Sequence, residues 1–336
     1  MRISKFFANL FSPNAKIEIE IKRDGEVWRI SPEKFEEFGL QDGDKLRVLA
    51  PPLGQALPVT WGDTNVPIAP GKSIRVPEVY KTAEFNGFEI PHHLVTLTGA
   101  GPETLESFGK AHIEKYEKYL GMFPDMTIID LGCGIGRDAV QLFDYLGPNG
   151  RYIGIDVTRD SIVWCTKNIT AKYPKFSFHH CDAVSELYNP FGSITSMDYR
   201  FPVPDASVDR IVLASVFTHL LENEVTHYLH EFRRVLKPGG LVYASFFLYT
   251  QEALEAAKEG GNTSWKATFK CEYGNGVFGN DPDYPRGAVA YTDEAFQRML
   301  NRAGLKLVRP YLKGWWSGLH GDQAEDGQDA AILRAI

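Results

Sequence analysis

The sequence predicts an α/β protein whose main domain is built on a largely parallel β-sheet. From residue 127 onward, short apolar runs alternate with amphipathic segments, which is typical of repeated strand–helix units. The first run, 127–131, leads into a loop with glycines at alternate positions, a turn that such sheets use between a strand and a helix. The last two runs, 305–311 and 330–336, have no full helix between them. An antiparallel pair of strands is therefore expected to close the sheet.

The composition limits the classes of partner and the location of the protein. Its net charge of −7 argues against a nucleic-acid partner, because binding to a phosphate backbone needs a basic face. No apolar run approaches the roughly 18 residues of a membrane span, and the four cysteines form no Cys-x-x-Cys pair. We expect a cytoplasmic protein with reduced thiols and no transmembrane segment. No metal site is expected, since the adjacent His92 and His93 would point in different directions on regular structure.

The chain divides into three predicted parts. Residues 1–15 are an N-terminal amphipathic segment with apolar residues at helical spacing. Residues 16–100 are interpreted as a small β-rich module and a linker rich in proline and glycine, and this module is a candidate for homo-oligomer contacts. Residues 101–336 form the α/β domain, in which 260–290 is expected to be a lid or insert. A predicted helix over 103–120 precedes the glycine loop and is expected to cover its ligand.

The glycine loop is the first indication of a ligand site. The segment Thr127–Asp138 reads TIIDLGCGIGRD, so that Asp130 is followed by Gly132, Gly134 and Gly136. Glycines at alternate positions let the backbone turn sharply and let a ligand approach it without a side-chain clash. This loop is therefore the predicted centre of the binding site.

Carboxylates follow the next two predicted strands. Asp156 ends the strand 152–157, and Asp182 follows the strand 176–180. The carboxyl ends of parallel strands meet at one edge of the sheet, where ligands of such folds bind. An acidic residue at the second strand end, 20 residues beyond Gly136, is the usual acceptor for two ribose hydroxyls. Asp182 would suit an adenine amino group.

The spacing of the glycines separates two ligand classes. A dinucleotide loop needs a third glycine at position 137, where this chain has Arg137. An acidic residue before the loop, Asp130, suits an ammonium group better than a phosphate. These features favour S-adenosylmethionine as the cofactor. Two alternatives stay open at this point: an NAD-dependent Rossmann oxidoreductase or epimerase, and a non-catalytic, nucleotide-sensing regulator.

A set of ordered motifs resembles the class I S-adenosylmethionine-dependent methyltransferases, in particular their type-11-like small-molecule members. The resemblance extends over about residues 105–336 and is carried by IDLGCGIGRD, IGIDVT, HHCDAV, DRIVLASVFTHL, EFRRVLKPGGLVYASFF and QDAAIL. It implies a Rossmann-like sheet of order 3-2-1-4-5-7-6 in which strand 7 is antiparallel. It also implies an enzyme that carries out methylation.

The resemblance implies roles for individual residues. The loop would line the methionine moiety, Asp156 would bind the ribose, and Ala214 and Ser215 would lie beside the sulfonium. Adenine would be read by Asp182 and the backbone of Ala183. The complete set of implied cofactor-binding residues is Asp130, Gly132, Cys133, Gly134, Gly136, Asp156, Val157, Asp182, Ala183, Ala214 and Ser215.

The acceptor is less defined by the sequence than the cofactor. His219 follows the predicted fourth strand, whose end should face the methyl group, and is the candidate general base for a hydroxyl acceptor. A small-molecule or saccharide acceptor and O-methylation are favoured, while nitrogen and carbon acceptors also fit the motifs.

Overall fold

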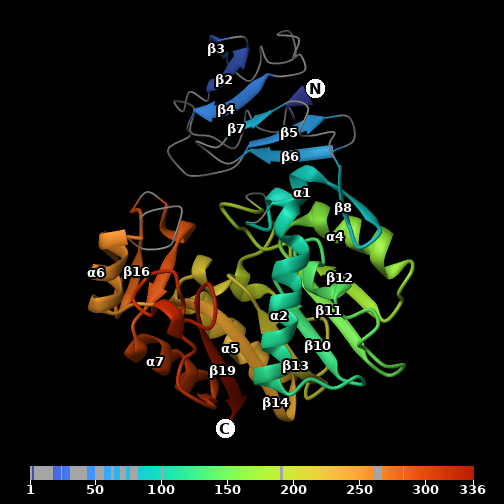
Figure 1. Cartoon of the computed structure of the whole chain (residues 1–336), viewed down its shortest axis with the longest axis vertical. Coiled ribbons are helices and arrows are strands. Elements are labelled where there is room, and N and C mark those ends of the chain that lie inside the picture. Colours follow the sequence, from blue (N-terminus) through green and yellow to red (C-terminus); the bar gives the residue numbers. More distant parts are fainter. Residues whose placement is uncertain are drawn as a thin grey trace. The chain divides into compact units, whose positions relative to one another are not determined.

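Figure 1 shows a computed structural model of the chain. The described residues are 2–3, 18–23, 25–30, 44–49, 57–61, 64–68, 73–75, 82–99, 101–189, 192–260, 267–282 and 284–336. They form two compact units, Met1–Glu106 with Val184–Gly192, and Ser107–Ala183 with Ser193–Ile336. No helix in these described ranges is long and apolar enough to cross a membrane.

The first unit consists of short antiparallel strands. They pair in the orders β1-β5-β6, β3-β2-β4-β7 and β8-β9. A bidentate ion pair joins β2 to the start of β4, where Arg23 donates two 2.6 Å hydrogen bonds to the buried Asp44. The elements are β1 (Arg2–Ile3), β2 (Glu18–Arg23), β3 (Glu26–Ile30), β4 (Lys45–Leu49), β5 (Leu57–Trp61), β6 (Thr64–Ile68), β7 (Ser73–Arg75), β8 (Thr82–Phe85), β9 (Phe88–Pro91), α1 (His92–Thr96) and η4 (Pro102–Thr104). Of the predicted amphipathic segment 1–15, only Arg2–Ile3 is described, and the rest lies outside the described residues.

The second unit contains the predicted parallel sheet. Its strands run in the order β12-β11-β10-β13-β14-β19-β18. The first five are mutually parallel, and β19 is antiparallel to both β14 and β18. Their bounds are β10 (Thr127–Leu131), β11 (Arg151–Asp156), β12 (Phe176–His180), β13 (Val208–Leu213), β14 (Leu236–Leu248), β18 (Leu305–Leu307) and β19 (Asp329–Ala335). In sequence order this is 3-2-1-4-5-7-6 with strand 7 antiparallel, so the predicted fold class is confirmed.

The two faces of this sheet carry different layers. Alternate residues of a strand point to opposite faces. On one face, Phe246 of β14 stacks on Phe296 with ring centroids 4.5 Å apart, within a large apolar cluster that α5 (Glu222–Val235) and α7 (Asp293–Ala303) complete. On the other face, Tyr243 of β14 meets Tyr116 of α2 (Leu105–Leu120) at 5.3 Å. Helix α2 therefore lies against the face opposite α5 and α7.

The remaining elements connect or extend the sheet. The described part of the predicted lid or insert, 260–290, adds strands: β17 is parallel to the end of β14, and β16 is antiparallel to β17 and β15. Residues 261–266 and 283 of it lie outside the described ranges, and a lid motion stays a prediction. The other bounds are α3 (Arg137–Val140), α4 (Arg159–Cys165), η5 (Thr166–Thr170), η6 (Ser196–Asp198), η7 (Phe217–His219), α6 (Gln251–Gly260), β15 (Cys271–Glu272), β16 (Val277–Gly279), η8 (Pro285–Gly287), β17 (Val289–Tyr291) and η9 (Gly321–Gln323).

Candidate active site

The glycine loop joins β10 to α3 and can be built only with glycines at its turning points. Gly132, Gly134 and Gly136 have φ angles of 81°, 51° and 75°, in the left-handed region that side chains disfavour. A Cβ on Gly132 would lie 2.4 Å from Cγ2 of Val216, which follows β13. The amide of Gly132 donates to the Ile155 carbonyl of β11 at 2.7 Å. The loop is therefore held closely against the ends of both neighbouring strands.

Asp156, at the end of β11, binds this loop through a hydrogen bond. Its two carboxylate oxygens accept hydrogen bonds from the amides of Gly134 at 2.7 Å and Thr158 at 2.6 Å. Burial raises the pKa of Asp156, whereas these two hydrogen bonds oppose the rise. Two carboxylate oxygens offer about four acceptor sites, so Asp156 keeps capacity for hydroxyl donors. Val157 comes next in the chain and is half-buried.

Asp130 is a buried carboxylate at the end of β10. It accepts a hydrogen bond from the Tyr152 hydroxyl of β11. Burial, together with the charge of Asp138, raises the pKa of Asp130 to about 8. A cationic group beside such a carboxyl would favour its ionised form and relieve this cost. The environment of Asp130 is therefore suited to an ammonium ligand.

The third predicted carboxylate lies one strand further along the sheet edge. The amide of Cys181 donates to the Asp156 carbonyl at 2.8 Å, which places Asp182 directly beyond the β11–β12 pairing. The Ser193 hydroxyl donates to the Asp182 carboxylate at 2.6 Å. Ala183 is buried and forms an isolated parallel bridge with Ile194.

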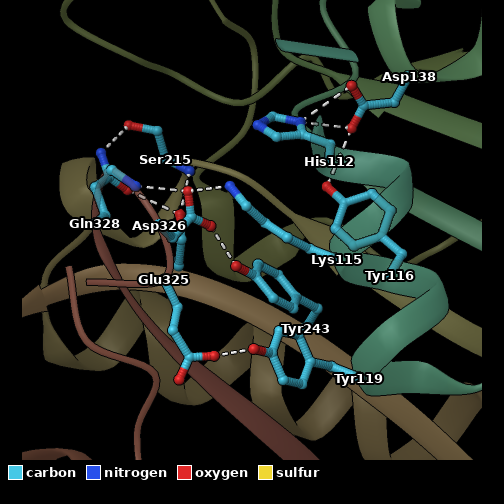
Figure 2. Close-up of polar contacts among 12 residues, drawn as sticks. His112, Lys115, Tyr116, Tyr119, Asp138, Ser215, Tyr243, Glu325, Asp326 and Gln328 are labelled. Atoms are coloured by element: carbon cyan, nitrogen blue, oxygen red, sulfur yellow. Dashed lines mark hydrogen bonds and ion pairs between the residues drawn. The ribbon is translucent and has the colours of Figure 1, made fainter. Parts of the chain in front are cut away.

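Ser215 marks the end of β13, next to Ala214. Its φ of 61° is unusual for a residue with a side chain. The Ser215 amide donates to the Ser245 hydroxyl at 2.8 Å, and the Gln328 side chain donates to the Ser215 hydroxyl at 2.8 Å (Figure 2). The next residue, Val216, is the one whose side chain lies against Gly132. The segment that follows β13 and the glycine loop therefore lie side by side.

His219 lies in the short helix η7 after this strand. Its Nδ1 is 2.9 Å from the Arg286 carbonyl oxygen, and burial lowers the pKa of the imidazole. Because a carbonyl can only accept, Nδ1 carries the proton of neutral His219. The role of general base that the sequence predicts for this residue stays a prediction.

Among the residues of the described ranges, no group of three or more His, Cys, Asp or Glu side chains is arranged to hold a metal ion. Cys133 of the loop is a buried free thiol whose pKa is raised by burial and by the charge of Asp156. It contributes to packing beneath the loop, where a Cβ on Gly154 would lie 2.8 Å from its sulfur.

Comparison with known proteins agrees with this geometry. The family model described as "Methyltransferase domain" matches residues 123–304, which is more than half of the chain and includes the glycine loop and the five parallel strands. The chain belongs to the class I S-adenosylmethionine-dependent methyltransferase family.

Several members of this family are similar to the chain in sequence. An arsenite methyltransferase of Aquipseudomonas alcaligenes is 30% identical over 143 residues, which are 40% of this chain and 39% of that protein. An arsenite methyltransferase of Halobacterium salinarum is 30% identical over 192 residues, 56% of this chain and 40% of that protein. The chain thus spans about two fifths of the length of these relatives. A solved methyltransferase from Aquifex aeolicus is 20% identical, with a TM-score of 0.40 over 66% of this chain and 87% of that one.

The chain also has polar residues on α2 that the sequence patterns did not single out. His112, Lys115 and Tyr119 repeat at helical spacing and contact Asp138, Asp326 and Glu325, as Figure 2 shows. Residues three, four and seven apart share one face of a helix. That spacing is visible in the sequence, but the carboxylates that these residues contact lie 26 to 211 positions away.

Proposed function

We propose that this protein is an S-adenosylmethionine-dependent methyltransferase that methylates a small molecule or a saccharide, by O-methylation. The observation that carries the proposal is the pair of buried carboxylates, Asp130 and Asp156, on either side of a loop that admits only glycine at Gly132. One carboxylate suits an ammonium group and the other suits vicinal hydroxyls. Such a pair does not suit a pyrophosphate, which argues against the dinucleotide-dependent alternative.

The chain's residues fit the cofactor as follows. Asp130 would hold the amino group, and Gly132, Cys133, Gly134 and Gly136 would line the methionine tail with backbone. Asp156 and Val157 would hold the ribose, Asp182 and Ala183 the adenine, and Ala214 and Ser215 the region of the sulfur. The bound cofactor supplies a methyl group on a positively charged sulfur. The protein's own contribution is to orient the acceptor and to exclude water, and positioning of this kind is worth up to roughly 7–11 kcal/mol.

The nature of the acceptor is supported by charge and by the surroundings of Ser215. A net charge of −7 disfavours nucleic acid, and the polar side chains of Ser215, Gln328 and His219 suit a hydroxyl-bearing molecule. Relatives of this chain are named for arsenite, sterol and thiol methylation. Hydroxyl specificity is therefore a property of this chain that needs its own test.

The cofactor can be tested by calorimetric titration of the full chain with S-adenosylhomocysteine. Replacing Asp156 by Asn should weaken binding roughly 10- to 100-fold, because charge-assisted hydrogen bonds are worth about 1.5–3 kcal/mol. Asp144→Asn is the matched control, since Asp144 is exposed. Binding of NAD in place of S-adenosylhomocysteine by the folded wild type would contradict the proposal.

The acceptor can be tested by transfer of a radiolabelled methyl group to a panel of phenols, sugars, thiols, sterols and arsenite. We expect hydroxyl acceptors to be labelled. Labelling of thiols or arsenite alone would leave the methyltransferase proposal intact and would contradict O-methylation.

Two broader predictions from the sequence are part of the proposal. The module within residues 16–100 is proposed to mediate homo-oligomerisation, which light scattering of the full chain during gel filtration would detect; a monomer at all concentrations would contradict it. A cytoplasmic location is proposed because Cys133, Cys165, Cys181 and Cys271 are free thiols.

A further inference from the structure

A histidine–aspartate pair joins α2 to the start of α3, directly after the glycine loop. Nδ1 of His112 lies 3.1 and 2.9 Å from the two carboxylate oxygens of Asp138 (Figure 2). The Tyr116 hydroxyl donates to the same carboxylate at 3.0 Å, and Nε of Arg137 lies 3.5 Å from it. Asp138 is buried, and 17% of the His112 side chain is exposed. The carboxylate thus has two hydrogen-bond partners and a guanidinium beside it, and part of the imidazole side chain stays accessible.

The surroundings of Asp138 determine which nitrogen of His112 carries the proton. Burial alone would raise the pKa of Asp138, but the charge and hydrogen bond of His112, with Arg137 and Tyr116, hold this pKa below its usual range. An ionised carboxylate can only accept, so Nδ1 of His112 carries a hydrogen in the charged ring and in the neutral ring alike, and in the neutral ring the lone pair is on Nε2. Within the part of the chain that the structure describes, Nδ1 is the His112 ring nitrogen that makes hydrogen bonds.

Contacts of α2 link the helix that carries His112 to two parts of the proposed site. Asp138 comes two residues after Gly136, the last glycine of the loop. One helical turn further along α2, Lys115 contacts Asp326 at 2.5 Å, and Gln328, two residues beyond Asp326, binds Ser215. In Figure 2 the second ring nitrogen of His112 points away from Asp138, to the side of the view where Ser215 and Gln328 lie.

His112 and His219 differ in the group that their Nδ1–H faces. The Nδ1–H of His112 faces a full negative charge, whereas that of His219 faces the Arg286 carbonyl. An imidazolium formed at His112 would be stabilised by the carboxylate, as in other histidine–carboxylate pairs. At His219 burial disfavours the charged ring.

We propose that His112 is the general base of the methyl transfer, with Asp138 and Tyr116 as its positioning residues and His219 as a residue of the acceptor pocket. This inference rests on the proposed function. The hydroxyl proton of the acceptor passes to Nε2 of His112 as the acceptor oxygen bonds to the transferred methyl carbon. The electron pair of the broken carbon–sulfur bond stays on sulfur, leaving a neutral thioether, a methyl ether and an imidazolium paired with Asp138.

The protonation geometry can be tested without any acceptor. Long-range nitrogen–proton correlation spectra of the full chain, labelled at its nine histidines, give the tautomer of each ring. The His112 signals are assigned by their absence in His112→Gln. We expect the Nδ1–H tautomer for neutral His112 in the wild type and a shift toward Nε2–H in Asp138→Asn. Tyr116→Phe, which removes one donor from Asp138, should keep Nδ1–H. An Nε2–H tautomer in the wild type would overturn the proposal, whatever the enzyme's activity.

The catalytic role is tested with the hydroxyl acceptor identified in the screen above. His112→Gln should lower kcat roughly 10²- to 10⁴-fold, the usual contribution of a general base, while the affinity for S-adenosylhomocysteine stays within about twofold of the wild type. His230→Gln, on the exposed side of α5, is the control and should match the wild type. A loss of cofactor affinity equal to the loss of rate would place His112 at the cofactor and overturn the proposal, as would a larger loss of kcat in His219→Gln. If the screen finds no acceptor, the proposed function fails, and the spectra still decide the tautomer.

Discussion

At the scale of single residues, the site is defined by how each carboxylate is neutralised. Asp156 accepts from two backbone amides and Asp138 from a histidine and a tyrosine, so both have donors within the protein. Asp130 has the hydroxyl of Tyr152 and a second carboxylate nearby. The protein's own donors stabilise the charges of Asp156 and Asp138. A positively charged ligand would stabilise the charge of Asp130.

The first prediction concerns the pH dependence of cofactor affinity. The pKa of Asp130 is raised to about 8 in the free protein, so below pH 8 this carboxyl is protonated. Pairing with an ammonium group requires the ionised form, and binding should then release a proton. Affinity for S-adenosylhomocysteine should rise with pH, by up to about tenfold per unit below pH 8, and then level off.

Calorimetric titrations at several pH values, in buffers of different ionisation enthalpy, would measure both the affinity and the proton released. In Asp130→Asn we expect the affinity for S-adenosylhomocysteine to lose the part of its pH dependence that Asp130 causes. Binding at pH 8 should also weaken. An equal slope in the variant and the wild type would show that Asp130 does not change its ionisation on binding.

At the scale of elements, the start of β19 is fixed by a single buried carboxylate. Asp329 accepts hydrogen bonds from the amides of Leu248 and Gly314, both at 2.9 Å, and from Nε1 of Trp316 at 2.7 Å. These contacts join the end of β14 and the segment before η9 to the antiparallel strand. Trp316 also packs against Phe247 and Phe269, with centroid separations of 5.2 and 5.7 Å.

The second prediction uses the adjacent tryptophans as a matched pair. Trp316→Phe removes one donor from buried Asp329 and leaves part of a packed volume empty, so the free energy of unfolding should fall by about 1–3 kcal/mol. Trp315 is 45% exposed, and Trp315→Phe should change stability by less than about 0.5 kcal/mol. Urea unfolding followed by circular dichroism would measure both. Equal effects of the two substitutions would contradict the role given to Asp329.

At the scale of the whole molecule, the sequence predicted the order of the sheet but not all of its polar contacts. Alternating βα runs and two final strands without a helix between them are local patterns, and they predicted a parallel sheet closed by an antiparallel pair. The order of the strands was implied by the resemblance to the methyltransferase family, and the binding roles of Asp130 and Asp156 stay predictions. The pairing of His112 with Asp138 was missed, because a helical face seen in the sequence does not reveal which distant carboxylate it meets. The same holds for Lys115 and Asp326, which are 211 positions apart.

The third prediction concerns where a bound cofactor stabilises the molecule. The predicted cofactor residues all lie in the second compact unit, and the amides of Gly134, Thr158 and Ser215 are held there by side chains of the site. A ligand at about 100 times its Kd stabilises the state it binds by about 2.7 kcal/mol, which corresponds to roughly 100-fold slower exchange of amides that open with the site. Hydrogen exchange of the full chain, with and without S-adenosylhomocysteine, should show this slowing in peptides from 127–140, 152–160 and 211–219.

Exchange in β2, β3 and β4 should stay unchanged, because these strands belong to the first unit. Equal protection of those strands would mean that the first unit takes part in binding, and the cofactor site would then have to include residues outside the methyltransferase fold.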